Sequence, residues 1–454
     1  MSSPKIKLTP YYRELLGDLD TPVSAYIKLN KPESFLLESV TGGEQVARYS
    51  FIGFDPFCSY ISKADDLHPV DQLQSLLNQY EIDPLPEIPA LAGGAVGFFS
   101  WEVLQTFEPI VFRDKPDTAI PMAHFIFPRS LVIFDHAQRK LLLLTLSEDH
   151  DVSAATARLD AIEAALQTPL PKSLMKMPEP SATCLAQVES NHSKESFQAG
   201  VLKAKSFIYE GDAFQLVLSQ KFRLPQKKQS FEVYRHLRLI NPSPYMFYFN
   251  FPQYQLMGSS PEMLVKLTDR KAVLRPIAGT RPRVRGQETV MIEDLKADKK
   301  EVAEHVMLVD LGRNDLGRVC DFHSVKVTEL MGIETYSHVI HMVSHIEGQL
   351  KSGKTAFDLF KATFPAGTLS GTPKLRAIEI IDELEPEKRG FYGGALGYFD
   401  LRGNMDLCII IRTILSQNNT LTVQAGAGLV ADSDPETEYE ESCNKAKGMI
   451  QACC

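Results

Sequence analysis

Residues 294–318 read DLKADKKEVAEHVMLVDLGRNDLGR, and their spacing predicts a helix that runs into a turn. Asp298 is the expected N-cap, and Glu301 three residues later completes a capping-box pattern. Three valines recur at helical spacing and are expected to face a core: Val302, Val306 and Val309.

A pair of carboxylates lies on another stripe of this helix. Glu301 and Glu304 fall about one turn apart, so their charges repel unless something compensates. One interpretation is a helix cap with a surface salt bridge to Lys300. The other is a proton-transfer acid beside a ligand for a divalent cation. The helix alone leaves both interpretations open.

The composition narrows the class of protein. A chain of 454 residues with 44% hydrophobic and 23% charged content is typical of a globular protein of two or three domains. A net charge of -9 without basic clusters argues against nucleic acid and membranes as partners. The start MSSPKIKLTP lacks a signal-peptide core, and apolar stretches such as LLLLTL are too short to span a bilayer. We expect a cytoplasmic protein.

A proline-rich segment divides the chain. TPLPKSLMKMPEPSA, residues 168–182, holds four prolines and no hydrophobic period. We therefore predict an N-terminal region over 1–167, a linker over 168–186 and a C-terminal region over 187–454. Strands from both regions could still share a sheet.

Polar residues within apolar segments mark candidate contacts to a ligand. A predicted turn at Gly279 and Thr280 offers backbone donors and a hydroxyl to a small anion, although it could be an ordinary turn. Arg412 is predicted inside the apolar strand IIIRT, and a buried arginine is costly unless it is paired. Either an internal acid or an anionic ligand would pair it. GAGLVA, residues 426–431, lacks the context of a dinucleotide site, and its glycines would let a ligand approach the backbone.

Three histidines in SHVIHMVSHIEG, residues 337–348, suggest a metal site at first sight. The surrounding valine and isoleucine residues favour a strand, in which His338 points away from His341. We therefore reject a three-histidine site and keep His341 as a single candidate acid, base or donor.

Two further helices begin with charged residues. In SGTPK, Thr372 is expected as the N-cap and Pro373 at N1, so that the helix start and Lys374 could receive a carboxylate. The final predicted helix, 435–452, carries glutamates one turn apart and a lysine four residues later: Glu438, Glu441 and Lys445. Taken alone, this pattern is a solvated salt-bridge face. Together with Arg412 and the glycines, the glutamate pairs suggest a Mg²⁺-assisted enzyme that handles a dicarboxylate.

Several motifs together resemble the chorismate-utilising enzymes. The motifs are PIAGT (276–280), EH-MLVDL-RND, SGTPK, YGGALGY (392–398), IIIRT (409–413), QAGAG (424–428) and a closing E-E-x-x-NKA. This set covers roughly residues 190–450. LLES (36–39), RYSFIG (48–53) and NPSPYM (241–246) extend the resemblance to nearly the whole chain and to the anthranilate-forming branch.

The resemblance implies a fold and an activity. The fold is α+β, with two interleaved subdomains built on large antiparallel β-sheets that form a sandwich flanked by helices. The activity is the Mg²⁺-dependent conversion of chorismate and ammonia to anthranilate and pyruvate, the first step of tryptophan biosynthesis, with feedback inhibition by L-tryptophan. Ammonia would come from glutamine on a separate glutamine amidotransferase subunit, component II, in a heterotetramer.

The resemblance also implies roles for individual residues. Chorismate-contacting positions are Gly279, Thr280, Tyr392, Arg412, Gly426, Ala427, Gly428 and, more weakly, Lys445. The Mg²⁺ ligands are Glu304 and Glu441, and the proposed catalytic residues are Glu301 as general acid, His341 for pyruvate elimination and, more weakly, Thr368. The tryptophan site is Ser39 with Pro244, Tyr245 and Met246, which could otherwise be turn and packing residues.

Two positions bear on the alternatives within the family. Ala278 stands where enzymes that make 4-amino-4-deoxychorismate for folate usually carry a nucleophilic lysine. Gln215 stands where isochorismate-forming enzymes carry a lysine that activates water. The 4-amino-4-deoxychorismate reaction is the alternative activity. A tryptophan-binding regulatory subunit with an inactive site is a different class of hypothesis, which the complete set of acidic and basic residues disfavours.

Overall fold

The computed structural model describes residues 4–39, 48–63, 66–83, 91–116, 119–148, 150–171, 186–335 and 339–454, apart from the side chains of Thr280 and Pro282. The helices are α1 (Pro22–Leu29), α2 (Pro69–Leu77), α3 (Val152–Leu166), α5 (Lys194–Tyr209), α6 (Ser230–Ile240), α7 (Glu288–Ala297), α8 (Lys299–Val319), α9 (Ala356–Thr363), α10 (Lys374–Leu384) and α11 (Pro435–Cys453). The 3-10 turns used below are η1 (Trp101–Thr106) and η4 (Gly367–Leu369).

One arm of the sheet system runs through the middle of the molecule. Its strands pair in the order β6 (Ala123–Asp135), β5 (Gly94–Phe99), β18 (Ala395–Asp400), β19 (Met405–Ile409), β12 (Met263–Thr268), β13 (Lys271–Leu274) and β16 (Val339–Gln349). At its end, β16 also pairs with β14 (Ile277–Pro282) and β15 (Lys326–Thr335).

The second arm also starts at β6. Its strands pair in the order β3 (Tyr49–Ile61), β2 (Ser34–Glu38), β10 (Tyr245–Asn250), β11 (Gln255–Ser260), β20 (Thr413–Gln417), β21 (Thr420–Leu429) and β9 (Gln215–Pro225). Short strands β8 (Glu189–Ser190) and β17 (Gly371–Thr372) pair with β9, and β7 (Lys140–Ser147), β1 (Ile6–Leu16) and β4 (Tyr80–Ile82) extend from β6. The β1–β4 pairing is parallel and the others are antiparallel.

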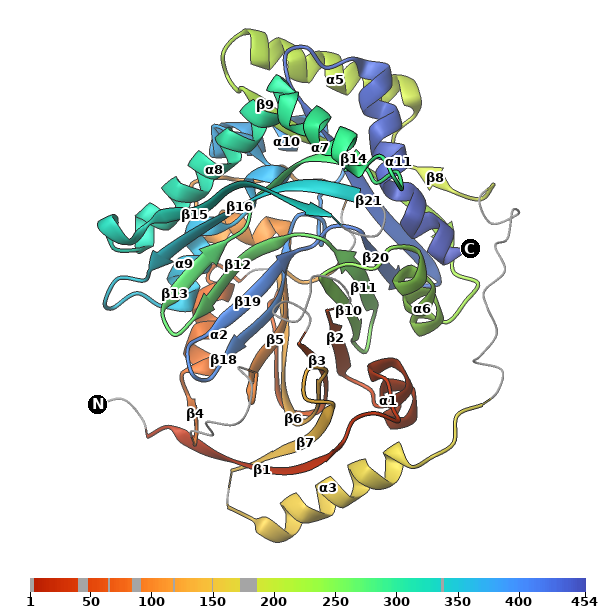
Figure 1. Cartoon of the computed structure of the whole chain (residues 1–454), viewed down its shortest axis with the longest axis vertical. Coiled ribbons are helices and arrows are strands. Elements are labelled where there is room, and N and C mark those ends of the chain that lie inside the picture. The colour runs from red at the N-terminus through yellow and green to blue at the C-terminus, as the bar shows by residue number, and fades with distance from the viewer. Residues whose placement is uncertain are drawn as a thin grey trace.

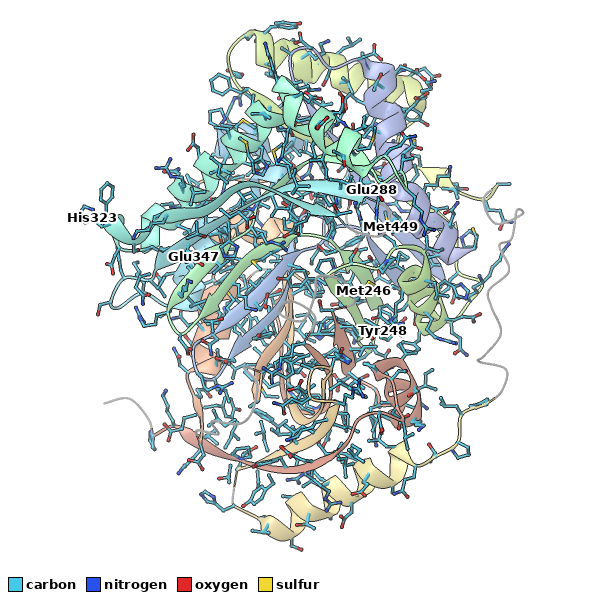
Figure 2. All side chains as sticks on the ribbon, viewed as in Figure 1. Met246, Tyr248, Glu288, His323, Glu347 and Met449 are labelled. Atoms are coloured by element: carbon cyan, nitrogen blue, oxygen red, sulfur yellow. The ribbon has the colours of Figure 1, made fainter. Side chains whose placement is uncertain are left out.

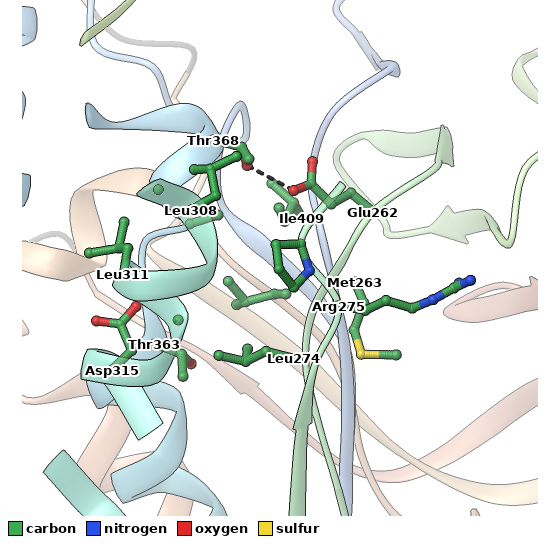
Figure 3. Close-up of a pocket in the computed structure, with 15 residues that line it drawn as sticks. Glu262, Met263, Leu274, Arg275, Leu308, Leu311, Asp315, Thr363, Thr368 and Ile409 are labelled. Atoms are coloured by element: carbon green, nitrogen blue, oxygen red, sulfur yellow. Dashed lines mark hydrogen bonds between the residues drawn. The ribbon is translucent and has the colours of Figure 1, made fainter. Parts of the chain in front are cut away.

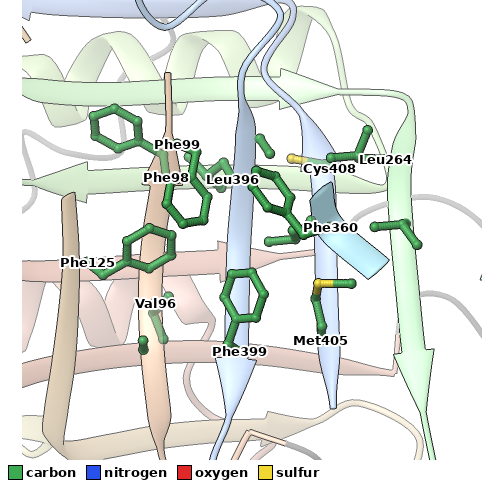
Figure 4. Close-up of a cluster of buried hydrophobic side chains, with 14 of the residues drawn as sticks. Val96, Phe98, Phe99, Phe125, Leu264, Phe360, Leu396, Phe399, Met405 and Cys408 are labelled. Carbon is green, nitrogen blue, oxygen red and sulfur yellow. The ribbon is translucent and has the colours of Figure 1, made fainter. Parts of the chain in front are cut away.

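The largest hydrophobic core joins the two arms. It contains Val96 and Leu396 from the first arm together with Phe247 and Leu256 from the second. Figure 4 shows aromatic side chains from neighbouring strands in this core, and α9 adds Phe360, which stacks on Phe99 at a ring-centroid distance of 4.7 Å. Apolar residues on alternate positions of both arms thus bury each other, which is the basis of a sandwich.

A second core lies between the β2–β10–β11–β20–β21 arm and helices. Residues of α1, α3, α6 and α11 pack against these strands, and Met246 and Tyr248 of β10 belong to this core together with Met449 of α11 (Figure 2). Figure 1 shows α3 beside β1 at the lower end of the molecule and α5, α7, α8, α10 and α11 at the upper end. The predicted α+β sandwich of antiparallel sheets with flanking helices is confirmed.

Strands from the two predicted regions are neighbours in these sheets. β2 pairs with β10, and β5 pairs with β18. The division of the chain at 168–186 stays a prediction, because residues 172–185 lie outside the described part. Among the described residues, no helix combines the length and apolar character that a membrane span requires.

Candidate functional site

The segment 294–318 holds the end of α7 and nearly all of α8, so the predicted helix after Asp298 is confirmed and continues to Val319 without the expected turn. Asp298 separates α7 from α8 and caps α8, since its Oδ1 accepts hydrogen bonds from the backbone N–H groups of Lys300 at 3.0 Å and Glu301 at 3.2 Å. The predicted N-cap is confirmed. The carboxylate of Glu301 does not close a capping box but accepts from Arg281 Nη1 at 3.3 Å.

The valines of α8 follow the predicted stripe only in part. Val309 is buried and Val302 is half-buried, whereas Val306 is 40% exposed. Opposing effects act on the pKa of the nearby Glu301 carboxylate. Burial raises the pKa of Glu301, the charge of Glu304 adds to this rise, and Arg281 opposes it.

Glu304 is bound to the start of β9. Its Oε1 accepts a hydrogen bond from Gln215 Nε2 at 3.0 Å. Gln215 also adjoins β21, because a Cβ placed at Gly428 would lie 3.2 Å from Gln215 Nε2. This glutamine therefore connects α8 with the glycine-containing strand β21.

Gly279 and Thr280 lie inside β14, so the predicted turn there is wrong. The register with β16 shifts between Ala278 and Thr280, and Gly279 has a φ of 83°. A β-bulge at glycine explains both facts. A Cβ at Gly279 would lie 3.4 Å from Glu301 Oε2, so the bulge brings its backbone against that carboxylate.

His341 lies opposite this bulge. It pairs in register with Thr280, is buried, and sits in β16, as the strand prediction required. Burial lowers the pKa of His341, and the positive charge of Arg412 lowers it further. His338 lies outside the described residues, and His345 contacts Glu347 at 3.3 Å.

Arg412 does not lie inside a strand, contrary to the prediction. The run 405–416 breaks into β19 and β20, and Arg412 stands between them with a φ of 49°. Its Nη1 approaches Asn241 Oδ1 at 3.5 Å. Burial lowers the pKa of Arg412, and the charge of Glu262 opposes this effect. An internal acid therefore lies near the arginine.

Glu262 is a functional candidate that the sequence analysis missed. It is 9% exposed, and its Oε1 accepts a hydrogen bond from Thr368 Oγ1 at 2.9 Å (Figure 3). Burial raises the pKa of Glu262 to about 7, against the opposing effects of Thr368, Arg412 and Lys445. The sequence signal was a single acidic residue between two apolar strands. A cavity of about 50 Å³ begins at Glu262 and Thr368 and extends along α8.

The first turns of α11 complete the acidic part of the site. Glu441 pairs with Lys445 at 2.7 Å, and Lys445 Nζ donates to Gly426 O at 3.2 Å. Glu438 is only 6% exposed, and its Oε2 has no hydrogen-bond partner among the described residues. Burial raises the pKa of Glu438, and Lys300 of α8 lowers it. The predicted solvated face is therefore wrong for Glu438.

The remaining predicted substrate contacts come from buried backbone and one ring. Gly426 and Gly428 pair with Ser219 and Val217 of β9, while Ala427 packs its methyl group into the core beneath β9. The Tyr392 ring is buried, and burial raises the pKa of its hydroxyl. The contacts therefore link Glu304 with β9 and β21, and they bring the charges of Arg412 and Lys445 near Glu262.

The SGTPK segment differs from its prediction. Thr372 belongs to β17 and pairs with Gln215, so Pro373 rather than Thr372 occupies the N-cap position of α10. Lys374 Nζ binds Asp315 of α8 at 3.0 Å. This lysine therefore has an internal carboxylate as its partner.

The predicted tryptophan-site residues come together elsewhere. Ser39 directly follows β2, and Glu38 pairs with Met246 in β10. The Ser39 hydroxyl is buried without a hydrogen-bond partner among the described residues, and Met246 is 1% exposed. Tyr245 donates its hydroxyl hydrogen to Asp406 at 3.0 Å. Pro244 stands between α6 and β10.

Described His, Cys, Asp and Glu residues do not form a group of three or more that could hold a metal ion. Lys300 in the first turn of α8 lowers the pKa of Glu438 in α11, so the starts of the two helices are near enough for their charges to interact. Any metal would therefore have to draw the carboxylates of α8 and α11 together with oxygens of a ligand.

Comparison with known proteins identifies the family. Residues 32–451 match the chorismate binding enzyme family. The chain is 44% identical to an anthranilate synthase component 1 of Synechocystis sp., over 98% of this chain and 95% of the relative. It is 43% identical to that of Neisseria meningitidis serogroup C, over 98% and 94%.

Solved structures agree. The anthranilate synthase component I from Streptococcus pneumoniae has a TM-score of 0.82 at 35% identity, over 96% of this chain and 99% of that one. MenF, the menaquinone-specific isochorismate synthase from Escherichia coli, shares the fold with a TM-score of 0.75 at 21% identity, over 100% and 97%. The family match and the extent of these similarities show that the chain belongs to the chorismate binding enzymes.

Proposed function

We propose that this protein converts chorismate and ammonia to anthranilate and pyruvate. The carrying observation is the identity of 44% over 98% of the chain to a relative named anthranilate synthase component 1. The residues of the site support the proposal, because a buried arginine, glycine backbones and glutamates on α8 and α11 suit a small dicarboxylate and a cation. Arg412 would bind one substrate carboxylate, and the backbones at Gly279 and Gly426 would approach the other polar groups.

The carboxylates also fit a Mg²⁺ ion. Glu304 and Glu441 would hold it, and Glu438 adds a buried oxygen without a hydrogen-bond partner among the described residues. Carboxylate oxygens are the ligands that Mg²⁺ prefers. Bound there, the ion would neutralise a substrate carboxylate and withdraw charge from the ring.

The reaction requires an acid for the departing 4-hydroxyl group. Ammonia would attack ring carbon 2 while the hydroxyl leaves from carbon 4, and the product is 2-amino-2-deoxyisochorismate. Glu301 and Glu262 are both candidates. The buried position of Glu262 and its pKa of about 7 favour Glu262, since a general acid works best when its pKa lies near the working pH.

Pyruvate elimination then requires a base. The ring loses its carbon 2 proton, the bond between carbon 3 and the enolpyruvyl oxygen breaks, and the ring becomes aromatic. The enolate of pyruvate leaves with the bonding electrons and takes up a proton on its methylene carbon to become pyruvate. His341 is proposed for this step, because burial and Arg412 lower its pKa and so favour a neutral imidazole that can accept a proton.

Two further parts of the proposal concern partners. Ammonia would come from glutamine on a component II glutamine amidotransferase subunit, in a heterotetramer. L-Tryptophan would inhibit the enzyme at Ser39, Pro244, Tyr245 and Met246. The buried Ser39 hydroxyl, which has no hydrogen-bond partner in the described part of the chain, supports this site, because a ligand could satisfy it.

The test is an assay of the purified chain with chorismate, Mg²⁺ and an ammonium salt at mildly alkaline pH. We expect anthranilate fluorescence that rises with time and that L-tryptophan suppresses. Loss of chorismate without fluorescence would instead indicate the 4-amino-4-deoxychorismate or isochorismate reaction. No loss of chorismate would favour a regulatory subunit.

A further inference from the structure

A buried guanidinium lies outside the carboxylate cluster. Arg389 follows α10 and is 2% exposed. It binds Glu385 with two hydrogen bonds, from Nε at 2.9 Å and from Nη2 at 2.7 Å. Its Cζ lies 4.4 Å from the centroid of a ring of Trp101, the single tryptophan of the chain. Glu385 also accepts from the backbone N–H and the hydroxyl of Ser219, at 2.9 and 2.7 Å.

The same guanidinium contacts two backbone carbonyls. Nη1 donates to Leu369 O and Nη2 donates to Val217 O, each at 2.7 Å. Leu369 directly follows Thr368, whose hydroxyl holds Glu262. The Nη1 group of Arg389 thus fixes the turn η4, and η4 carries the Thr368 hydroxyl that donates to Glu262.

Its other contacts reach two more parts of the site. Val217 pairs with Gly428 of β21 and lies two residues after Gln215, the partner of Glu304. The centroid of the Tyr392 ring lies 5.4 Å from Arg389 Cζ. The turn η4, strand β9 and the Tyr392 ring come from distant parts of the chain, and this side chain contacts all three.

Stability alone does not account for the arrangement. A buried ion pair often contributes no more stability than apolar side chains of the same volume, because desolvation offsets the attraction. The planar guanidinium holds its N–H donors in a fixed geometry, and it therefore specifies the relative positions of the groups that accept from it. The hydrogen bonds of Arg389 among the described residues all go to Glu385, Leu369 and Val217, so it does not itself bind Glu262.

We propose that Arg389 is a positioning residue, which sets η4, β9 and the Tyr392 ring in the arrangement that the reaction requires. This inference rests on the proposed function, and it assigns to Arg389 no contact with chorismate. It acts on Glu262 through Thr368.

The main variant combines Arg389→Met with Glu385→Gln. It removes both charges of the pair together and keeps an acceptor for Ser219, so neither partner is left as a buried charge without the other. The matched control combines Lys115→Met with Asp382→Asn, which removes another largely buried ion pair of α10, with a separation of 2.8 Å. We expect kcat/KM for chorismate to fall at least about tenfold in the main variant and less than about threefold in the control. Trp101 emission should stay that of a buried indole in both.

The pH profile separates positioning from a loss of folded protein. Glu262 faces Thr368, Arg412 and Lys445, and the Thr368 hydrogen bond lowers its pKa. If η4 moves, this bond weakens, the pKa of Glu262 rises, and the alkaline limb of kcat/KM shifts to higher pH. Thr368→Val should cause the same shift, and adding Thr368→Val to the main variant should shift the limb no further.

Three results would overturn the inference. The first is an equal loss of kcat/KM in the control, and the second is an alkaline limb of kcat/KM that does not shift in the main variant. The third is a combined variant whose shift is the sum of the shifts from the main variant and from Thr368→Val. If the main variant does not fold, Arg389→Lys tests the same point, because an ammonium keeps the charge but lacks the fork that reaches both carbonyls. A wild-type chain that forms no anthranilate would refute the proposed function itself. A wild-type chain that forms it, with the Arg389 variants equal to the control, would refute only the inference.

Discussion

Two buried glutamates, one at the end of α10 and one in α11, differ in how many of their carboxylate oxygens accept hydrogen bonds. Glu385, at the end of α10, is 4% exposed, and both of its oxygens accept hydrogen bonds from Arg389. Glu438, in the first turn of α11, is 6% exposed, and its Oε2 has no partner among the described residues. Similar burial with unequal hydrogen bonding is what we expect if the first acid holds the fold together and the second contributes an oxygen to the proposed metal site.

The largest expected effect tests the structural acid. Glu385→Gln leaves the Arg389 charge buried without its counter-ion, and we expect a loss of about 3–5 kcal/mol in the free energy of unfolding. Glu438→Gln removes a buried charge whose Oε2 has no partner among the described residues and keeps an oxygen for Ser433, so we expect no loss. Urea unfolding of both variants measures this, and similar losses would remove the distinction between the two acids.

The next effect tests the functional acids. Glu304→Gln or Glu441→Gln should reduce Mg²⁺-dependent anthranilate formation more than about 100-fold with the fold intact, because ligand loss exceeds the usual effect of supporting residues. Activity assayed against Mg²⁺ concentration, with circular dichroism as the control for folding, measures this. Wild-type activity at the wild-type Mg²⁺ requirement would contradict the metal assignment.

A third effect concerns the pH dependence of stability. The pKa of Glu262 is about 7 in the folded state and near 4.5 unfolded, so the folded state binds more protons between these values. Its ionisation therefore destabilises the fold progressively as the pH rises from about 4.5 to about 7. Glu262→Gln should be more stable than wild type at pH 8 by about 3 kcal/mol, with this advantage lost at pH 4. Thermal unfolding at both pH values measures it, and a constant difference would refute the assignment.

The smallest effect extends the comparison to the predicted tryptophan site. Ser39, like Glu438, has a buried oxygen without a hydrogen-bond partner among the described residues. Ser39→Ala should leave stability nearly unchanged but weaken inhibition by L-tryptophan about fivefold, the value of one hydrogen bond. Met246→Thr should also weaken it. Unchanged inhibition curves for both variants would remove this site.

The sequence predicted the elements well where local chemistry decides them. Asp298 caps α8 and the Val–Ile run 339–343 forms a strand, because a capping side chain and β-branched residues act within a few positions. The bulge at Gly279 and the break at Arg412 were missed. Both depend on the register of neighbouring strands. The sequence pattern of an apolar run such as IIIRT does not show whether the strand continues through it or breaks.

The candidate site was predictable only through the family resemblance. Spacing along the chain placed Glu301 near Glu304 and Glu438 near Glu441, but it could not show that α8 and α11 begin close to one another. It also could not show that Glu262 is buried beside Thr368, because that burial arises from strands β12 and β19 and from η4. Positions set by long-range packing have no local signature.

The pairing of β2 with β10 and of β5 with β18 has a practical consequence for protein engineering. A fragment that begins after the proline-rich segment would leave two long strand edges without partners, and such edges invite aggregation. The N-terminal region therefore cannot be trimmed away to obtain a smaller enzyme. The proposed inhibition by L-tryptophan would have to be released by single substitutions within an intact chain.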